Sequence, residues 1–264
     1  MAMLVLARAA GCEVAAVHVD HGLRAGSELD GQIVARVAER FGATARTVAV
    51  DVDAGPNLEA RARAARRAVL PADALLGHTA DDQAETMLLN LLRGAAVDGL
   101  AGMRRDRRPI LSLRRVETHA LCESLGLEVV HDPTNTDPGI RRNRVRHELL
   151  PLLDDIAQRD VAAVLARQSD LIREVTDDLE DRASSLDPTD ARALAAAPRV
   201  LARRALRDWL RGCSPERHPP DAATVDRVLS VAQGSIAATD VGGGWRIERH
   251  RQRLVLVPPA GPVH

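Results

Sequence analysis

The residues best suited to chemistry lie in the segment GHTADDQAET, residues 77–86. Asp81, Asp82 and Glu85 closely follow His78, and on a helix Asp82 and Glu85 would share one face. Two carboxylates so placed could hold one magnesium ion or one ammonium group. Helix capping is the alternative, because the helix dipole favours carboxylates in the first turns. Capping explains one or two of these acids but not three beside a histidine, so the segment favours a functional site.

The segment HVDHGLR, residues 18–24, is a second candidate. Gly22 permits a tight turn, and His21 and Arg24 could flank a nucleotide there. A pair of histidines in a loop is equally compatible with a loop that has no functional role. The segment therefore indicates a nucleotide site only in combination with the others.

The segment RRNRVRHELLPLL, residues 141–153, is the third candidate. Its arginines are Arg141, Arg142, Arg144 and Arg146. Arginine binds phosphate and carboxylate groups bidentately, so these side chains could clamp either kind of anion. For this segment taken alone, a solvated basic face is the somewhat better interpretation.

Apolar runs and periodic stripes indicate how the chain positions these segments. Three short apolar runs predict buried strands, at residues 13–20, 45–50 and 73–76. A helix is predicted after each strand, and two of these helices begin with the spacing of a capping box, at Ser27 with Asp30 and at Thr79 with Asp82. This alternation predicts an α/β fold, with a parallel sheet and helices on its faces. Ligands in such folds bind beyond the carboxyl ends of the strands, where both candidate loops emerge.

The second half of the chain has a different pattern, which becomes helical from about residue 148. A long amphipathic helix is predicted around residues 165–179, with further helices near 198–211 and 221–233. The closing run GGGWRIERHRQRLVLV alternates apolar and basic residues and predicts a β-hairpin. We therefore expect two domains, residues 1–147 and residues 148–264.

The composition excludes several kinds of chemistry. The 264 residues include no lysine, which excludes a Schiff-base lysine and a Walker-type phosphate lysine. The net charge of -1 provides no overall basic surface, so any RNA-binding surface must be a local basic patch. Arginines at 104, 105, 107, 108, 114 and 115 predict such a patch. The three cysteines form no CxxC pair, which argues against a zinc ribbon or an iron–sulfur site and fits a reducing cytoplasm. We find no apolar run long enough to span a membrane, and expect a cytoplasmic protein.

In their order and spacing, the three segments together resemble the tRNA(Ile)-lysidine synthases, a PP-loop family with the N-type ATP pyrophosphatase fold. The resemblance extends over essentially the whole chain. It includes RPIL at 108–111, DPTN at 132–135 and the long run at 141–153. The set is specific, although no single motif in it is.

The resemblance implies a ligase that forms a C–N bond. ATP would adenylate the C2 oxygen of the wobble cytidine in a minor isoleucine tRNA with a CAU anticodon. The ε-amine of free L-lysine would then displace AMP and give lysidine. The implied fold is an adenine nucleotide alpha hydrolase-like sheet followed by a helical domain that binds the tRNA substrate. Whether the protein is a monomer or a homodimer stays open.

The resemblance also implies roles for particular residues. The implied catalytic residues are Asp81, Asp82, Glu85, Arg142 and Arg146, with Asp82 as the ligand of Mg²⁺. Which carboxylate binds magnesium and which binds the lysine ammonium stays open, and the two arginines would hold phosphate or the lysine carboxylate. The residues expected at the nucleotide are His18, Asp20, His21, Arg24, Gly77 and His78.

The chain departs from the family pattern at three places. Thr79 stands where the family usually has a second histidine, and Arg67 stands where the second helix of the family often has a tyrosine. The SGGxDS loop, which cradles pyrophosphate through backbone amides, does not occur in the sequence, and we expect the strand before it to be missing too. The 264 residues are therefore expected to be truncated at the N-terminus and to bind ATP weakly. A loop-less, inactive tRNA-binding relative is the main alternative, and the lack of a CxxC pair argues against a tRNA-thiolating enzyme.

Overall fold

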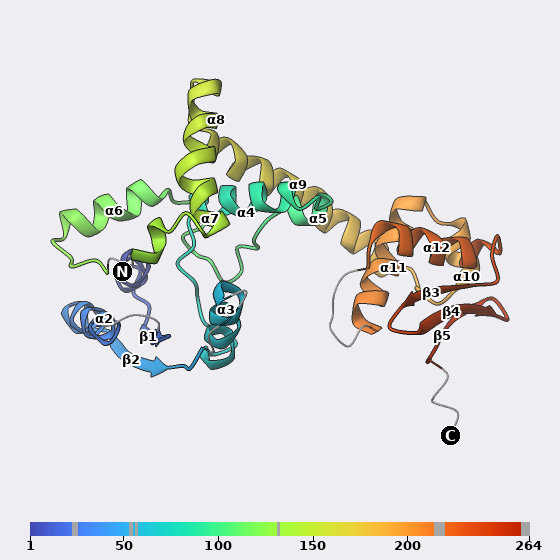
Figure 1. Cartoon of the computed structure of the whole chain (residues 1–264), viewed down its shortest axis with the longest axis horizontal. Coiled ribbons are helices and arrows are strands. Elements are labelled where there is room, and N and C mark those ends of the chain that lie inside the picture. The colour runs from blue at the N-terminus through green and yellow to red at the C-terminus, as the bar shows by residue number, and fades with distance from the viewer. Residues whose placement is uncertain (23–25, 53–54, 56–57, 131–132, 214–219, 260–264) are drawn as a thin grey trace. The chain divides into compact units, whose positions relative to one another are not determined.

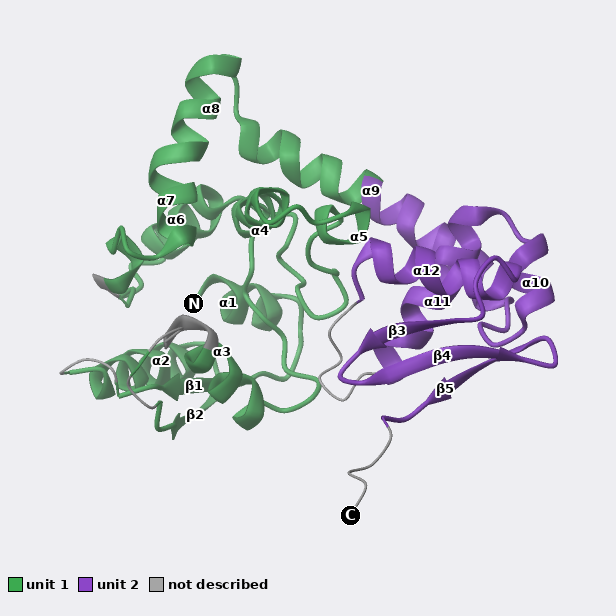
Figure 2. Cartoon of the chain, turned by 45° about the vertical axis from the view of Figure 1, so that its right-hand side comes forward, with its two compact units in different colours: residues 1–171 green, residues 172–264 purple. Residues whose placement is uncertain are grey.

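The computed structural model of the chain describes residues 1–22, 26–52, 55, 58–130, 133–213 and 220–259. It divides into two compact units, Met1–Leu171 and Ile172–His264 (Figure 2). The division falls within the long helix α9, Val161–Ser184. The functional boundary expected after residue 147 lies earlier in the chain and stays a prediction.

The first unit contains a parallel pair of strands, β1 (Ala15–Asp20) and β2 (Thr44–Ala49), joined by helix α2 (Glu28–Arg40) (Figure 1). Helix α2 packs closely on the strands, because Gly31 lies against β2. A Cβ atom at that position would come within 2.4 Å of the Thr47 hydroxyl oxygen. The core of this layer is completed by helices α1 (Ala2–Ala9) and α6 (Arg115–Ser124).

Two local predictions in this unit are wrong. Residues 73–76 do not form a third strand. They make isolated backbone hydrogen bonds, such as that from the Leu76 N–H to the Arg107 carbonyl at 2.8 Å. A strand needs a ladder of such bonds with a neighbouring strand. Ser27 also makes no side-chain capping bond, because its backbone is already helical at φ -63° and ψ -24°.

The remaining helices of the first unit position the candidate site. They are α3 (Leu58–Val69), α4 (Ala80–Leu92), α5 (Val97–Leu100), a 3₁₀ turn (Pro133–Thr136), α7 (Arg141–Arg144), a π-helical turn (Val145–Leu149) and α8 (Leu150–Ala157). The last three form one uninterrupted helical run. Buried residues of α4, this run and the start of α9 share one apolar core. Helix α4 is therefore held against the run that carries the arginines of residues 141–146.

The second unit packs helices on a small antiparallel sheet. Its helices are α10 (Ala191–Ala196), α11 (Arg199–Cys213) and α12 (Ala222–Gln233), and its strands are β3 (Ala238–Gly242), β4 (Trp245–His250) and β5 (Arg253–Val257). The predicted hairpin is confirmed as β4 and β5, which pair from Arg246 with Val257 to His250 with Arg253. Arg251 and Gln252 turn it with positive φ values of 46° and 67°, as a two-residue hairpin loop requires. The sheet also gains β3, which sequence reasoning missed.

The expected fold class is confirmed: a parallel strand pair flanked by helices, then a helical part that ends in a small antiparallel sheet. Cys12, Cys122 and Cys213 are all free thiols. Within the described residues, no helix combines the length and the apolar character needed to cross a membrane.

Candidate active site

The candidate site is built on the first two turns of helix α4. Asp82 Oδ2 accepts hydrogen bonds from the Thr79 backbone N–H at 2.8 Å and from the Thr79 hydroxyl at 2.9 Å. The capping box predicted at these residues is therefore confirmed. It fixes the start of the helix, which places Asp81 and Asp82 in the first turn and Glu85 one turn later, facing the interior.

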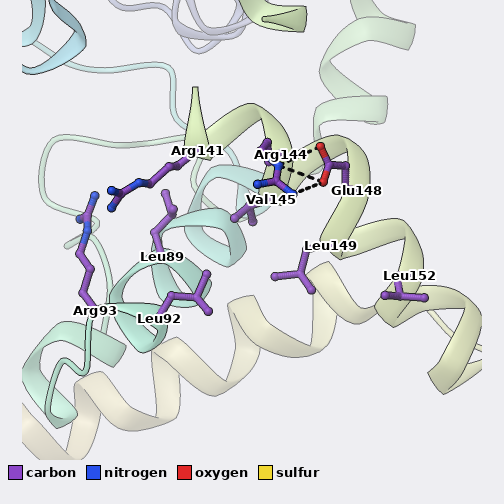
Figure 3. Close-up of a pocket in the computed structure, with 9 residues that line it drawn as sticks. All are labelled: Leu89, Leu92, Arg93, Arg141, Arg144, Val145, Glu148, Leu149 and Leu152. Carbon is purple, nitrogen blue, oxygen red and sulfur yellow. Dashed lines mark hydrogen bonds and ion pairs between the residues drawn. The ribbon is translucent and has the colours of Figure 1, made fainter. Parts of the chain in front are cut away.

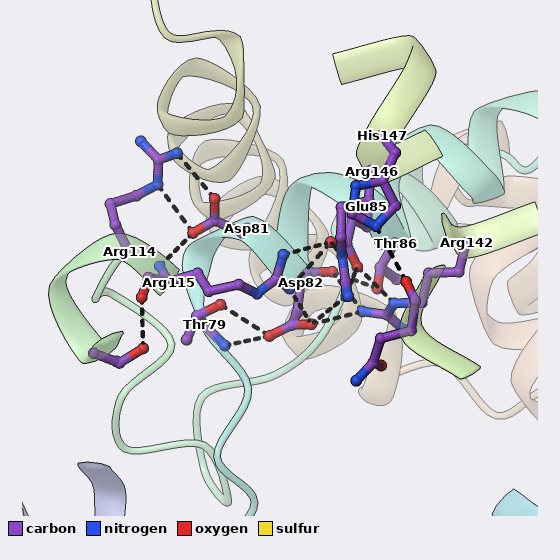
Figure 4. A network of polar contacts seen from close by, with 12 residues as sticks. Thr79, Asp81, Asp82, Glu85, Thr86, Arg114, Arg115, Arg142, Arg146 and His147 are labelled. Carbon is purple, nitrogen blue, oxygen red and sulfur yellow. Dashed lines mark hydrogen bonds and ion pairs between the residues drawn. The ribbon is translucent and has the colours of Figure 1, made fainter. Parts of the chain in front are cut away.

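Glu85 is the centre of a cluster of charged side chains (Figure 4). Its carboxylate is fully buried, at 0% exposure. Oε1 accepts hydrogen bonds from Arg146 Nε at 2.7 Å and from both terminal nitrogens of Arg115 at 3.1 Å. Oε2 accepts from Arg142 Nε at 2.6 Å and Arg146 Nη2 at 3.2 Å. A buried carboxylate needs partners of opposite charge, and here three guanidinium groups supply them.

Asp82 forms ion pairs with the same three arginines, of which Arg146 is the most distant at 3.8 Å. Its Oδ1 accepts from Arg115 Nη2 at 3.0 Å and from Arg142 Nη2 at 3.1 Å. Burial acts to raise the pKa of Asp82, but the hydrogen bond from the Thr79 backbone and the charges of Arg115 and Arg142 outweigh it and hold the pKa below its ordinary value. Unlike Glu85, the Asp82 side chain is 16% exposed, so solvent and a ligand can reach it.

Asp81 organises the other side of the cluster. It accepts two bonds from the Arg114 guanidinium, at 2.9 and 3.1 Å, and one from the Arg115 backbone N–H at 2.6 Å. Burial opposes ionisation of Asp81, yet these bonds lower its pKa. Arg114 also pairs with Asp160. Asp81 therefore fixes the start of α6, from which Arg115 reaches Glu85 and Asp82.

The structure separates the arginines that the sequence grouped together. Arg142 and Arg146 point to Glu85, as expected of a site, but Arg141 and Arg144 line a separate cavity of about 450 Å³ at the far end of α4 (Figure 3). There Arg144 binds Glu148 at 2.8 Å. Arg114 and Arg115, which the sequence assigned to an RNA-binding patch, bind the acids of α4 instead. Nothing in their local sequence signals this, because the contacts join segments about 30 residues apart.

The acids of α4 do not fit a magnesium ion in this arrangement. Both Asp82 oxygens accept N–H or O–H donors, and Glu85 is enclosed by guanidinium groups. Among the described residues, no three His, Cys, Asp or Glu side chains gather where they could hold a metal. A divalent cation at Asp82 would have to displace arginine, so the assignment of Asp82 as a metal ligand stays a prediction.

The residues expected at the nucleotide lie on two elements. His18 and Asp20 end β1, where Asp20 Oδ1 accepts the Gly22 N–H at 2.9 Å. That bond, the largest of several causes, lowers the pKa of Asp20. His21 follows in the same turn, whereas Arg24 lies outside the described residues. The hydrogen bonds of the α4 acids given above involve none of these side chains.

Gly77 and His78 lead directly into α4. Burial lowers the pKa of His78 to about 4, the charge of Asp82 opposes this, and nearby arginines reinforce it. The His78 Nδ1 atom is buried and has no hydrogen-bond partner. A neutral imidazole with a free nitrogen therefore stands beside the acidic cluster.

The chain is similar to proteins of known family over nearly its whole length. A model of the PP-loop domain matches residues 1–153. The tRNA(Ile)-lysidine synthase of Mycobacterium tuberculosis (strain ATCC 25618 / H37Rv) is 38% identical over 94% of this chain and 84% of its own length. That of Mycolicibacterium paratuberculosis is 42% identical, over 94% and 83%, and that of Nocardia farcinica is 38% identical, over 96% and 87%.

A solved structure supports the fold. The U34-tRNA thiolase of Methanococcus maripaludis superimposes with a TM-score of 0.51, covering 65% of this chain and 69% of that one, at 16% identity. At that identity the likeness concerns the fold alone. The identity to the synthases and the length matched go further: the chain belongs to the tRNA(Ile)-lysidine synthase family.

Proposed function

We propose that the chain ligates free lysine to C2 of the wobble cytidine of an isoleucine tRNA with a CAU anticodon, using ATP and forming lysidine. The observation that carries this proposal is the match to relatives named tRNA(Ile)-lysidine synthase, which runs over 93–97% of the chain. The PP-loop domain accounts for the use of ATP. The same match does not favour an inactive tRNA-binding relative. A thiolating enzyme is not favoured either, because the three cysteines are free thiols far apart in the sequence.

The proposed reaction has two steps. The C2 oxygen of the cytidine attacks the α-phosphorus of ATP, and pyrophosphate leaves with the electrons of the broken P–O bond. The ε-amine of lysine then attacks C2, the bond from C2 to the activated oxygen breaks, and AMP leaves. The amine loses one proton in this second step.

The geometry supports different roles for the two acids that share a face of α4. Asp82 is the carboxylate that an incoming lysine ammonium can reach, because its side chain is 16% exposed while that of Glu85 is 0% exposed. Glu85 instead positions Arg142 and Arg146, the groups that would face phosphate or the lysine carboxylate. Arg115 bonds to Asp82 in this structure, so lysine binding at Asp82 requires Arg115 to move.

Magnesium and lysine belong to the proposal as expected partners. Because the α4 acids are already bonded to arginines, we assign no step to a metal held by them. Whether the enzyme is a monomer or a homodimer is a separate expectation on which the proposed chemistry does not depend.

Lysine transfer tests the proposal directly. The protein is incubated with ATP, labelled lysine and a transcript of the CAU-anticodon tRNA, both as the 264-residue chain and extended by the SGGxDS loop of the family. We expect lysine incorporation that requires ATP and that disappears when the wobble cytidine is replaced by uridine. Incorporation by neither version, or incorporation into the uridine transcript, contradicts the proposal.

A further inference from the structure

Five arginines line a second cavity of the first unit, with a volume of about 350 Å³. They come from two places in the sequence. Arg63, Arg66 and Arg67 lie on helix α3. Arg107 directly precedes the RPIL segment, and Arg108 is its first residue. His78 completes the polar part of the lining. We call this cavity the arginine pocket.

The arginine pocket holds more positive than negative charge. Among the described residues, none of its five arginines forms an ion pair with a carboxylate. The bonds that Arg107 and Arg108 do make go to backbone carbonyls, of Ala72 and of Arg104. Two of the pocket's nitrogens, Arg108 Nε and His78 Nδ1, are buried and have no hydrogen-bond partner in the part of the chain that the structure describes. Buried polar atoms without partners are uncommon in folded proteins and point to a missing ligand or solvent molecule.

The electrostatics of the pocket are unfavourable for the protein by itself. Burial lowers the pKa of Arg63 and of Arg66, and the charges of neighbouring arginines lower both further. Burial also lowers the pKa of Arg108; the charge of Asp106 opposes this, and the charges of Arg107 and Arg67 reinforce it. Arginine nevertheless stays charged in proteins, so these cations repel one another in a partly dry site. Charged groups with perturbed pKa values of this kind cluster at functional sites.

The pocket adjoins the candidate active site. His78 lines it and immediately precedes Thr79, which caps α4. The charge of Asp82 acts on His78, and the charge of Arg142 acts on both Arg63 and Arg66. A group bound in the pocket would therefore lie next to the acids and arginines of the α4 cluster.

We propose that the arginine pocket binds a phosphate group of a substrate. Clustered guanidinium groups match phosphate in charge and in geometry. The proposal rests on the proposed function, because the substrates of that reaction supply the phosphate. The phosphate belongs either to the backbone of the tRNA or to the triphosphate of ATP. Arg67, the position where the family often has a tyrosine, adds an exposed cation to the lining of the pocket.

Binding measurements on charge-removing variants test the proposal. The variants are Arg66→Gln with Arg108→Gln, and Arg67→Gln alone, whose exposed side chain can be changed without disturbing the fold. Arg36→Gln is the matched control, because Arg36 is an exposed arginine of the same unit that pairs with Glu128. Calorimetry uses tripolyphosphate, ATP and an anticodon stem–loop RNA as probes.

We expect the parent and the control to bind tripolyphosphate alike and the double variant to bind it at least about tenfold more weakly, because charge-assisted hydrogen bonds to phosphate are lost. Arg67→Gln should weaken binding less, in the same direction. A parallel loss for ATP assigns the triphosphate, and a loss for RNA with a salt slope smaller by about one per lost contact assigns the tRNA backbone. Unchanged binding of all three probes by both variants, or no binding of any probe by the parent, overturns the proposal.

The proposed function can fail separately. Binding of phosphate in the pocket by a protein that transfers no lysine would refute the lysine ligase and leave the pocket intact. Lysine transfer by a protein whose pocket variants bind every probe normally would refute the pocket alone.

Discussion

The α4 cluster and the arginine pocket use the same residue type in opposite ways. In the cluster, Arg114, Arg115, Arg142 and Arg146 meet the carboxylates of Asp81, Asp82 and Glu85. In the pocket, five arginines meet none among the described residues. A balanced cluster holds its own segments together, whereas an unbalanced one is completed by a ligand. The difference shows that the role of an arginine cluster depends on whether the fold places carboxylates beside it.

The largest effect on stability is expected when the α4 cluster loses the charge of Glu85. Glu85→Gln leaves three half-buried guanidinium groups facing a neutral amide, which should lower the free energy of unfolding by about 3–5 kcal/mol. Urea unfolding measures it, with Glu123→Gln on the exposed side of α6 as the control. A loss no greater than that of the control would show that Glu85 does not hold the arginines together.

The next effect concerns turnover and shows whether Asp82 acts in lysine transfer or only caps the helix. Asp82→Asn should lower lysine transfer by roughly 10²–10³-fold, as removal of a preorganised charge commonly does, while tRNA binding stays nearly unchanged. Asp155→Asn, an exposed acid of α8, is the control. Transfer at the parental rate would reduce Asp82 to the helix-capping role that its bonds to Thr79 already give it.

A smaller effect concerns the connection between the two regions. Gln83, buried on α4, accepts the Met103 N–H at 2.8 Å and donates to the Met103 carbonyl at 3.2 Å, which anchors the chain just before Arg107 and Arg108. Gln83→Leu leaves these backbone groups unpaired and should cost about 1–3 kcal/mol in urea unfolding. Exposed Gln32→Leu is the control. Equal stability of the two variants would mean that the anchor adds nothing.

The smallest effect is expected at an exposed ion pair of the second unit. Bonds from Thr189, first its hydroxyl and then its backbone, and from Arg253 lower the pKa of Asp187 from 3.8 to about 2. Its ionised form therefore stabilises the fold above pH 3.8, and this contribution is lost as the pH falls from 3.8 towards 2. Asp187→Asn should flatten acid unfolding slightly in that window. An unchanged acid profile contradicts the assignment.

The sequence predicted much of what depends on local pattern, although the capping spacing at Ser27 formed no side-chain cap. The capping box at Thr79, the helices around it and the hairpin at the end follow from spacing and periodicity, and they were found as expected. The family motifs also pointed to the acids of α4, whose catalytic roles stay a prediction. Fold class was predictable because the strand and helix alternation is itself a sequence property.

The sequence could not predict what depends on distant partners. Residues 73–76 have the composition of a strand, but forming one requires a neighbouring strand that no local pattern reports. Arg114 and Arg115 have the appearance of a surface patch until α6 brings them to Asp81 and Glu85. Arg141 and Arg142 are adjacent in sequence, yet the helix turns them to different sites.

The arginine pocket needs a ligand to balance its charge, whereas the acids of α4 already balance the arginines around them. Urea unfolding of the parent and of the Arg66→Gln, Arg108→Gln double variant, each with and without tripolyphosphate, tests this contrast most directly. Without the probe the variant should be as stable as the parent or slightly more stable, because repulsion between cations is relieved. With the probe at about 100 times its Kd, the parent should gain about 2.7 kcal/mol and the variant much less. A variant that loses several kcal/mol without the probe, or gains as much from it as the parent does, would contradict the account.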